Sequence, residues 1–251
     1  MSLDERDAVL GRLSSTDGRK EYEKYFMSNA YLMNHSVSFS GGNDKSSFYA
    51  SLESQTDRGT DMDSSNEYKM FFRDILKPAQ WLSLDLSANA FFSFDKSHFM
   101  SHGLTDLPYM SYYGEDGTEL SLSNYILSDA YRREIEGITG INLTYNPVSD
   151  FLASTASTRQ QGINANVGLS VRIAKWLSYE GRFQYSLTSG SGERFMPAQT
   201  FGVRIERAQG TDMNGTQYLP SSGGHFTSLN STMRSYTVRN QINIDKAFGD
   251  E

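Results

Sequence analysis

Apolar and polar residues alternate strictly along several segments of the chain. The clearest segment runs from Leu82 to Asp95, and its apolar positions are Leu82, Leu84, Leu86, Ala88, Ala90, Phe92 and Phe94. The positions between them are polar except for Phe91. Successive side chains of a β-strand point to opposite faces, so this segment predicts a strand with one apolar and one polar face. The same alternation runs through 163–173 and 177–187.

The alternating segments are longer than most strands of soluble proteins. Globular strands average about five to six residues, whereas alternating segments of about 10 residues are typical of transmembrane β-barrels, with lipid outside and water inside. The pattern therefore predicts an all-β fold, an antiparallel transmembrane β-barrel segment. The alternative is a secreted soluble β-sandwich that binds carbohydrate, because sandwich strands alternate in the same way.

Two polar residues interrupt the apolar sides of the predicted strands. Asp74 breaks the strand that contains Phe72, and Asn240 breaks the last strand. A Lys or Arg at the bilayer midplane costs about 2–4 kcal/mol, Asp costs less, and the cost falls toward the interfaces. Asp74 stands just before Lys77, near the predicted end of its strand, so we expect it near an interface.

Short and long connections alternate between the predicted strands. Together the strands make an incomplete barrel of about 8–10 strands, and they are the segments 31–41, 46–56, 66–76, 81–94, 139–146, 149–157, 162–173, 177–188 and 232–247. Long loops are predicted at about 96–138 and 189–228 and are extracellular, because long loops of outer-membrane barrels face outward. Segment 149–157 is assigned as a strand mainly so that the short and long connections continue to alternate. The alternating segment 200–207 has no place as a spanning strand and is assigned to the second long loop.

The first part of the chain predicts helix. We divide the chain into residues 1–30, a helical and linker segment, and residues 31–251, the partial barrel. Residues 19–26 are helix-prone after the Asp17-Gly18 turn, and a further helical turn is predicted within 121–137.

Composition excludes several classes of function. The 251-residue chain has a formal net charge of −7 and no block of Lys and Arg, which argues against a nucleic-acid partner. It has no cysteine, so disulfides, thiolate metal ligands and cysteine nucleophiles are excluded. No apolar run approaches the roughly 18 residues of a membrane helix. The first residues lack the basic-then-apolar order of a secretory signal.

No motif in the chain carries catalytic chemistry. His98 and His102 have a ligand spacing only on a helix, and we interpret them as exposed loop residues. Asp61 and Asp63 resemble the start of a calcium loop, but the turn glycine and the closing Glu are missing. We therefore predict no catalytic residue, no metal site and no cofactor, and we expect that the protein is not an enzyme.

One segment, residues 34–52, has the sequence Asn-His-Ser-Val-Ser-Phe-Ser-Gly-Gly-Asn-Asp-Lys-Ser-Ser-Phe-Tyr-Ala-Ser-Leu. This segment resembles the first barrel hairpin of SusC/RagA-type TonB-dependent outer-membrane transporters. Shared features are an Asn-His alternating strand, Ser-Gly-Gly, Asp-Lys and an aromatic-rich return strand. Further stretches agree in order over roughly residues 20–251, namely Lys77 to Leu82, Leu107-Pro108-Tyr109 with Gly114-Glu115-Asp116-Gly117, Tyr145-Asn146-Pro147, Leu219-Pro220 with Gly223-Gly224, and Tyr236 to Gln241 into Phe248-Gly249-Asp250-Glu251.

The resemblance implies a function and a set of partners. Members of this family import oligosaccharides or peptides across the outer membrane, so the resemblance implies an outer-membrane location and contact with its lipid. It also implies association with a plug domain, the rest of the barrel, a SusD-like surface lipoprotein and the TonB complex. The family's plug, TonB-contacting segment and remaining strands have no counterpart in this sequence. We therefore expect a barrel-wall fragment that does not transport alone.

Two groups of residues are candidates for binding. The polar positions predicted to face the lumen are Asp85, Asn89, Asn164, Asn166, Arg172, Glu180, Arg182, Gln184, Arg239, Asn243 and Asp245. Such residues form ladders along the wall or hold a plug, and some of them could line a substrate path. Loop aromatic residues that could stack on sugar rings, or pack the loop against a lid, are Phe99, Tyr109, Tyr112, Tyr113 and Tyr125.

Overall fold

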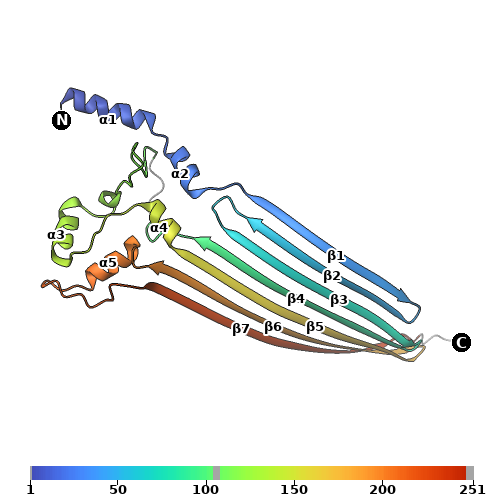
Figure 1. The fold of residues 1–251 in the computed structure, drawn as a ribbon. Coiled ribbons are helices and arrows are strands. Elements are labelled where there is room, and N and C mark those ends of the chain that lie inside the picture. The colour runs from blue at the N-terminus through green and yellow to red at the C-terminus, as the bar shows by residue number, and fades with distance from the viewer. Residues whose placement is uncertain (1, 104–107, 247–251) are drawn as a thin grey trace.

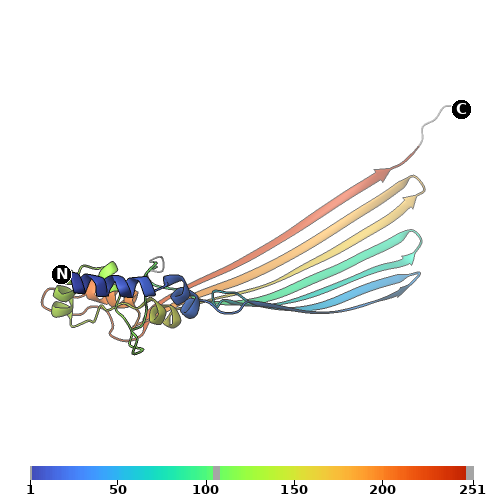
Figure 2. The ribbon, with the colours of Figure 1, turned by 90° about the horizontal axis from the view of Figure 1, so that it is seen from above.

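One antiparallel sheet of seven strands dominates the computed structural model, which describes residues 2–103 and 108–246. The strands lie side by side in sequence order (Figure 1), and they are β1 (Tyr31–Asn43), β2 (Ser46–Arg58), β3 (Ser64–Ala79), β4 (Leu82–His98), β5 (Thr155–Ala174), β6 (Leu177–Pro197) and β7 (Gly224–Ile244). The sheet is open and bends along its length (Figure 2), with β1 and β7 at its edges. Of the stretches that resemble the transporter family, Leu107 and residues 248–251 lie outside the described residues.

The helices gather at one end of the sheet (Figure 1). They are α1 (Leu3–Ser15), α2 (Gly18–Phe26), the 3₁₀ turn η1 (Ser123–Tyr125), α3 (Asp129–Thr139), α4 (Pro147–Ala153) and α5 (Phe201–Gln209). We call α2–α5, η1 and the loops that join them the cap. The opposite end, the turn end, holds the tight connections β1–β2, β3–β4 and β5–β6. No helix in the described part of the chain combines the length and the apolar character needed to cross a membrane.

Strand pairing places the alternating residues on two distinct faces. One row of directly paired residues crosses all the strands on the apolar face: Phe39, Ala50, Phe72, Ala88, Ala165, Tyr185 and Tyr236. The next row lies on the opposite, polar face: Ser38, Ser51, Phe71, Asn89, Asn164, Ser186 and Ser235. The register therefore joins the alternation of separate strands into two continuous surfaces, because directly paired residues share a face.

The apolar face of the sheet is not covered by a second layer. Val167, Phe183 and Val238 pair across β5, β6 and β7 and are 43%, 45% and 61% exposed. A β-sandwich would bury these side chains against a second sheet. The described residues form a single sheet, so the soluble sandwich alternative is wrong for this part of the chain. The structure confirms an antiparallel, mostly β fold, and the seven strands that it describes are fewer than predicted.

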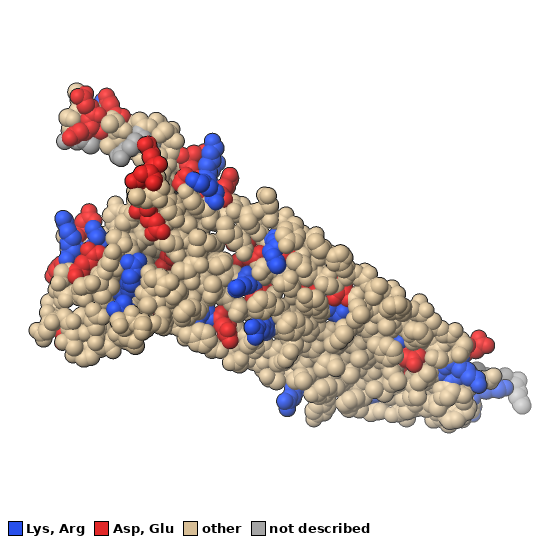
Figure 3. Space-filling model, viewed as in Figure 1, with Lys and Arg blue, Asp and Glu red and all other residues tan. Residues whose placement is uncertain are grey.

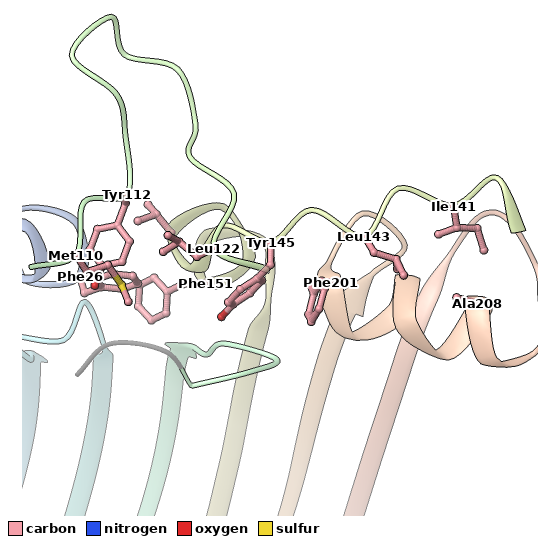
Figure 4. Packing of buried hydrophobic residues seen from close by; sticks show 11 residues of the cluster. Phe26, Met110, Tyr112, Leu122, Ile141, Leu143, Tyr145, Phe151, Phe201 and Ala208 are labelled. Atoms are coloured by element: carbon pink, nitrogen blue, oxygen red, sulfur yellow. The ribbon is translucent and has the colours of Figure 1, made fainter. Parts of the chain in front are cut away.

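The hydrophobic core lies in the cap rather than along the sheet (Figure 4). Its buried members are Phe26, Met110, Tyr112, Leu122, Ile141, Leu143, Tyr145, Val148, Phe151, Phe201 and Ala208. Phe26 packs edge-on against Tyr112 and Phe151, with ring centroids 5.2 Å and 5.1 Å apart. Because its core comes from α2, the long β4–β5 connection and α5, the cap joins segments that are distant in sequence.

The predicted strands at 139–146 and 149–157 are wrong. Ile141, Leu143 and Tyr145 alternate as in a strand and are 5%, 1% and 1% exposed, but they lie in an extended loop whose side chains enter the cap core. The second segment holds the end of helix α4 and the start of β5, so β4 pairs directly with β5. Residues 201–209 form helix α5 within the second long connection.

Candidate functional site

The apolar face of the sheet carries a band of apolar side chains that has the same length on β5 and β6. On β5 the band runs from Ile163 to Ile173, and on β6 it runs from Leu177 to Leu187. These ten residue steps correspond to about 34 Å of strand at about 3.4 Å per residue. A tilt of about 35–45°, typical of membrane barrels, makes the band about 24–28 Å tall. Outer-membrane barrels carry an apolar band of about 25 Å.

Aromatic side chains lie near both ends of the band. Tyr185 and Tyr236 are direct partners near its cap side, and the next positions of this face are Leu187 on β6 and Arg234 on β7. Both tryptophans, Trp81 and Trp176, lie in connections of the turn end and are 55% and 43% exposed, and Trp81 lines a hollow there with Ser83, Arg172 and Glu180 of the polar face. On the face shown in Figure 3, charged side chains lie on α1, over the cap and the adjacent part of the sheet, and again at the turn end. Aromatic girdles of this kind stand at both lipid–water interfaces of membrane barrels.

Each of the two polar residues that interrupt the band accepts a hydrogen bond from a neighbouring strand. The Ser46 hydroxyl donates to Oδ1 of Asp74 at 3.2 Å. The Tyr179 hydroxyl donates to Oδ1 of Asn240 at 2.6 Å. Each interruption thus has a partner on the neighbouring strand, which lowers the cost of placing a polar group among apolar ones.

The predicted polar set shares the opposite face of the sheet. Register pairs Asn89 with Asn164, Gln184 with Asn166 and Ser178 with Asn243. The remaining strand members alternate with the band in the same way, and they are Asp85, Arg172, Glu180, Arg182 and Arg239. Asp245 follows β7, and its backbone N–H donates to the carbonyl oxygen of Trp176 at 2.9 Å.

Arg73 and Asp85 form a two-pronged ion pair on the polar face. Arg73 Nε donates to Asp85 Oδ1 at 3.0 Å, and Nη2 donates to Oδ2 at 2.7 Å. Both side chains are nearly half exposed, so water screens their attraction, and the pair mainly fixes the position of the two groups. Sequence reasoning missed Arg73. The signal was available, because Phe72 and Asp74 on either side lie on the apolar face and β3 pairs with β4.

A hollow of about 350 Å³ opens on the polar face beside this ion pair. Gly168 lies in its floor, opposite Asp85 on β4 and Arg182 on β6. The hollow is open at this point because glycine has no side chain. Arg239 on β7 completes the rim and is the direct register partner of Arg182.

Asn146 connects three segments of the cap. Its amide nitrogen donates to the backbone oxygens of Tyr112 and Leu120 at 2.7 Å and 3.1 Å. Its side-chain oxygen accepts from the backbone N–H of Val148 at 2.9 Å, which caps helix α4 with Pro147 at the first helical position. Asn146 is 6% exposed, so its polar atoms are satisfied inside the core.

Asp150 holds the start of helix α5. Its Oδ1 accepts from the backbone N–H of Phe201 at 2.8 Å, and Oδ2 accepts from the backbone N–H of Ser101 at 2.7 Å. A carboxylate at this position complements the positive end of the helix dipole. Tyr145 packs 4.8 Å from the Phe201 ring, its hydroxyl donates to the backbone oxygen of His102, and burial raises the pKa of that hydroxyl. The Tyr145-Asn146-Pro147 motif therefore builds the cap.

The five predicted loop aromatics occupy different environments. Tyr112 is 0% exposed in the cap core, so its ring cannot stack on a ligand, and we remove it from the predicted set. Tyr113 packs 4.9 Å from Tyr25, and burial is the main cause that raises the pKa of Tyr113. Phe99 lies under the guanidinium of Arg194, 3.8 Å from ring centroid to carbon. Tyr109 and Tyr125 are 59% and 57% exposed. Among the described residues, no group of three or more His, Asp or Glu could hold a metal ion.

Comparison with known proteins places the fold near two transporter structures. No protein-family model and no curated protein sequence matches the chain. The structure of the RagAB peptide transporter is similar with a TM-score of 0.55 and 16% identity, over 72% of this chain and 20% of that chain. The structure of the RagAB peptide importer in the 'closed-closed' state is similar with a TM-score of 0.57 and 13% identity, over 92% of this chain and 32% of that chain.

At these identities the similarity shows the fold. The strand arrangement of this chain occurs within part of a transporter chain, and this chain spans between a fifth and a third of the length of those structures.

Proposed function

We propose that this chain forms a wall portion of a SusC/RagA-like TonB-dependent importer in an outer membrane. The observation that carries the proposal is the apolar band, whose side chains are exposed on one face of the strands and which has aromatic residues near both ends. A soluble protein would expose this surface to water at a large free-energy cost, whereas a bilayer covers it. The similarity to the RagAB structures and the hairpin at residues 34–52 support the same proposal.

The orientation in the membrane follows from the two ends of the sheet. The cap end holds the long connections, and the turn end holds the tight ones. Long loops of outer-membrane barrels lie outside the cell and short turns face the periplasm. We therefore propose that the cap faces outward, where a SusD-like lipoprotein would contact it, and that the polar face lines the lumen and contacts a plug.

The proposed cargo is an oligosaccharide or a peptide. The two similar structures are a peptide transporter and a peptide importer, which favours peptides. The role is structural and binding, without catalysis, and coupling to TonB would come through other parts of the complete transporter.

Single cysteines test the proposal, because the chain has no cysteine of its own. Asn166→Cys and Val167→Cys place one thiol on the polar and on the apolar face, at adjacent positions of β5. In lipid vesicles we expect a water-soluble maleimide to label position 166 and to leave position 167 at least tenfold less reactive. In urea both thiols should react equally. Equal labelling of the two positions in vesicles would refute the membrane assignment.

A further inference from the structure

Two arginines face each other directly on the polar side of the sheet. Arg182 on β6 and Arg239 on β7 are register partners, and both side chains are exposed. Like charges directly opposite each other on neighbouring strands destabilise a sheet. Arg239 donates to the neutral Oε1 of Gln241 at 2.6 Å. The ion pairs formed within the described part of the chain include neither arginine.

The hollow beside the pair is positively charged although the chain is acidic, while Glu180 lies two positions from Arg182 on the same face of the sheet. Three arginines and one aspartate line the hollow beside Gly168, which leaves it a net charge of +2 in a chain of net charge −7. Arg73 and Asp85 already satisfy each other. Arg182 also feels the charge of Asp85, but both oxygens of that carboxylate accept hydrogen bonds from Arg73, so the excess positive charge of the hollow belongs mainly to Arg182 and Arg239.

We propose that Arg182 and Arg239 together bind a carboxylate group of an acidic polypeptide segment packed on the polar face. A carboxylate accepts from two guanidinium groups through charge-assisted hydrogen bonds and removes the repulsion between them. The side-chain amides of Asn166 and Gln184 line the same hollow and can bond a backbone laid beside the carboxylate.

The shape of the hollow favours a polypeptide over a free small molecule. Sites for small ligands bury about 70–90% of the ligand surface. This hollow opens on the face of a sheet, between side chains of β3 to β7, and has no wall above the sheet. A polypeptide that covers the face supplies that wall. The proposal goes beyond the role of the chain as a wall portion of an importer. Its test measures peptide binding by the two arginines and gives an answer whether or not the apolar band lies in lipid.

Binding of two short peptides to the full chain in detergent micelles tests the proposal. The probes are fluorescently labelled peptides of five glutamates and of five glutamines. We expect the glutamate peptide to bind at least tenfold more tightly than the glutamine peptide, and the double variant Arg182→Gln, Arg239→Gln to lose this preference. Arg172→Gln is the matched control, because Arg172 lies on the same face near the turn end and should retain most of the preference.

Unfolding midpoints separate a binding role from a structural one. Removing one of two repelling charges should leave the unfolding midpoint of Arg182→Gln without peptide unchanged or higher, whereas an arginine that holds the sheet together would lower it. Equal binding of the two peptides to the wild-type chain would overturn the proposal, even if the double variant does not fold. Free glutarate that binds as tightly as the glutamate peptide would overturn the polypeptide assignment.

Discussion

The hydroxyl of Tyr179 on β6 donates a 2.6 Å hydrogen bond to the side-chain oxygen of Asn240 on β7. Asn240 is the direct partner of Gly181, and the Tyr179 ring lies over that glycine, where an added Cβ would be 3.0 Å from the hydroxyl oxygen. The glycine thus leaves room for the tyrosine to reach an amide that would otherwise stand unpaired among apolar residues.

Removing this hydroxyl should destabilise the sheet only while Asn240 is present. We expect Tyr179→Phe to lower the free energy of unfolding by about 1–2 kcal/mol, because it leaves a polar oxygen without a donor. In the Asn240→Leu background the same change should cost less than about 0.5 kcal/mol. Urea unfolding in detergent micelles measures both values, and equal costs in the two backgrounds would contradict the role of the hydrogen bond.

Adjacent positions on β5 should respond in opposite ways to a charge. Val167→Arg places a cation near the middle of the apolar band and should lower the free energy of unfolding in vesicles by about 2–4 kcal/mol. Asn166→Arg places the same cation on the polar face, where water solvates it, and should cost less than Val167→Arg even though Asn166 lines the hollow that holds Arg182 and Arg239. Folding yields in vesicles measure the difference. A larger loss for position 166 would reverse the assignment of the two faces.

Asn146 should be essential for the cap and not for the sheet. Asn146→Ala removes the cap of α4 and leaves the carbonyls of Tyr112 and Leu120 without its amide, so we expect a loss of about 2 kcal/mol in local stability. Amide exchange should rise in 108–154 and stay unchanged in β5 and β6. Asn142→Ala is the control, because the side-chain oxygen of Asn142 accepts one exposed bond from the N–H of Thr144, and the backbone oxygen that accepts from Arg204 stays in place.

The turn at Asp212 should weaken in acid. The backbone N–H of Thr216, followed by that of Asn214 and the Tyr218 hydroxyl, donates to the carboxylate and lowers the pKa of Asp212 below its usual value near 3.8. A lowered pKa in the folded state contributes stability above the unfolded value, and this stability is lost as pH falls through the folded pKa.

Amide exchange of residues 212–218 measures this loss. Corrected for its intrinsic rate, exchange should rise between about pH 4 and pH 2. Asp212→Asn should lack that rise, and a rise of equal size in the variant would exclude the carboxylate as its cause.

The sheet could be predicted from the sequence because alternation in an extended segment gives one apolar and one polar face. Leu82–Phe94 and Ile163–Ile173 carry the alternation over their whole length, and both are strands. Ile141, Leu143 and Tyr145 alternate as well, yet they lie in a loop. Alternation requires only an extended backbone with one buried side, and the cap core provides that side without strand pairing.

The candidate site could be predicted only in part. The polar set follows from the alternation, so its common face was predictable strand by strand. The register between neighbouring strands decides which residues pair. Arg182 and Arg239 pair across β6 and β7, and the length of the long β6–β7 connection does not determine that register. Asn146 and Pro147 form a helix-start signature, but the rule that strands alternate in direction favoured a strand at this position.

Tryptophan fluorescence in vesicles tests the membrane placement most directly, because Trp81 and Trp176 are the two tryptophans of the chain and both lie at one limit of the apolar band. Trp81→Phe and Trp176→Phe leave one reporter each. We predict strong quenching by lipids brominated near the headgroup and weaker quenching by lipids brominated near the ends of the acyl chains. Emission unchanged by either lipid in both variants would show that the band does not lie in a bilayer and would contradict the account.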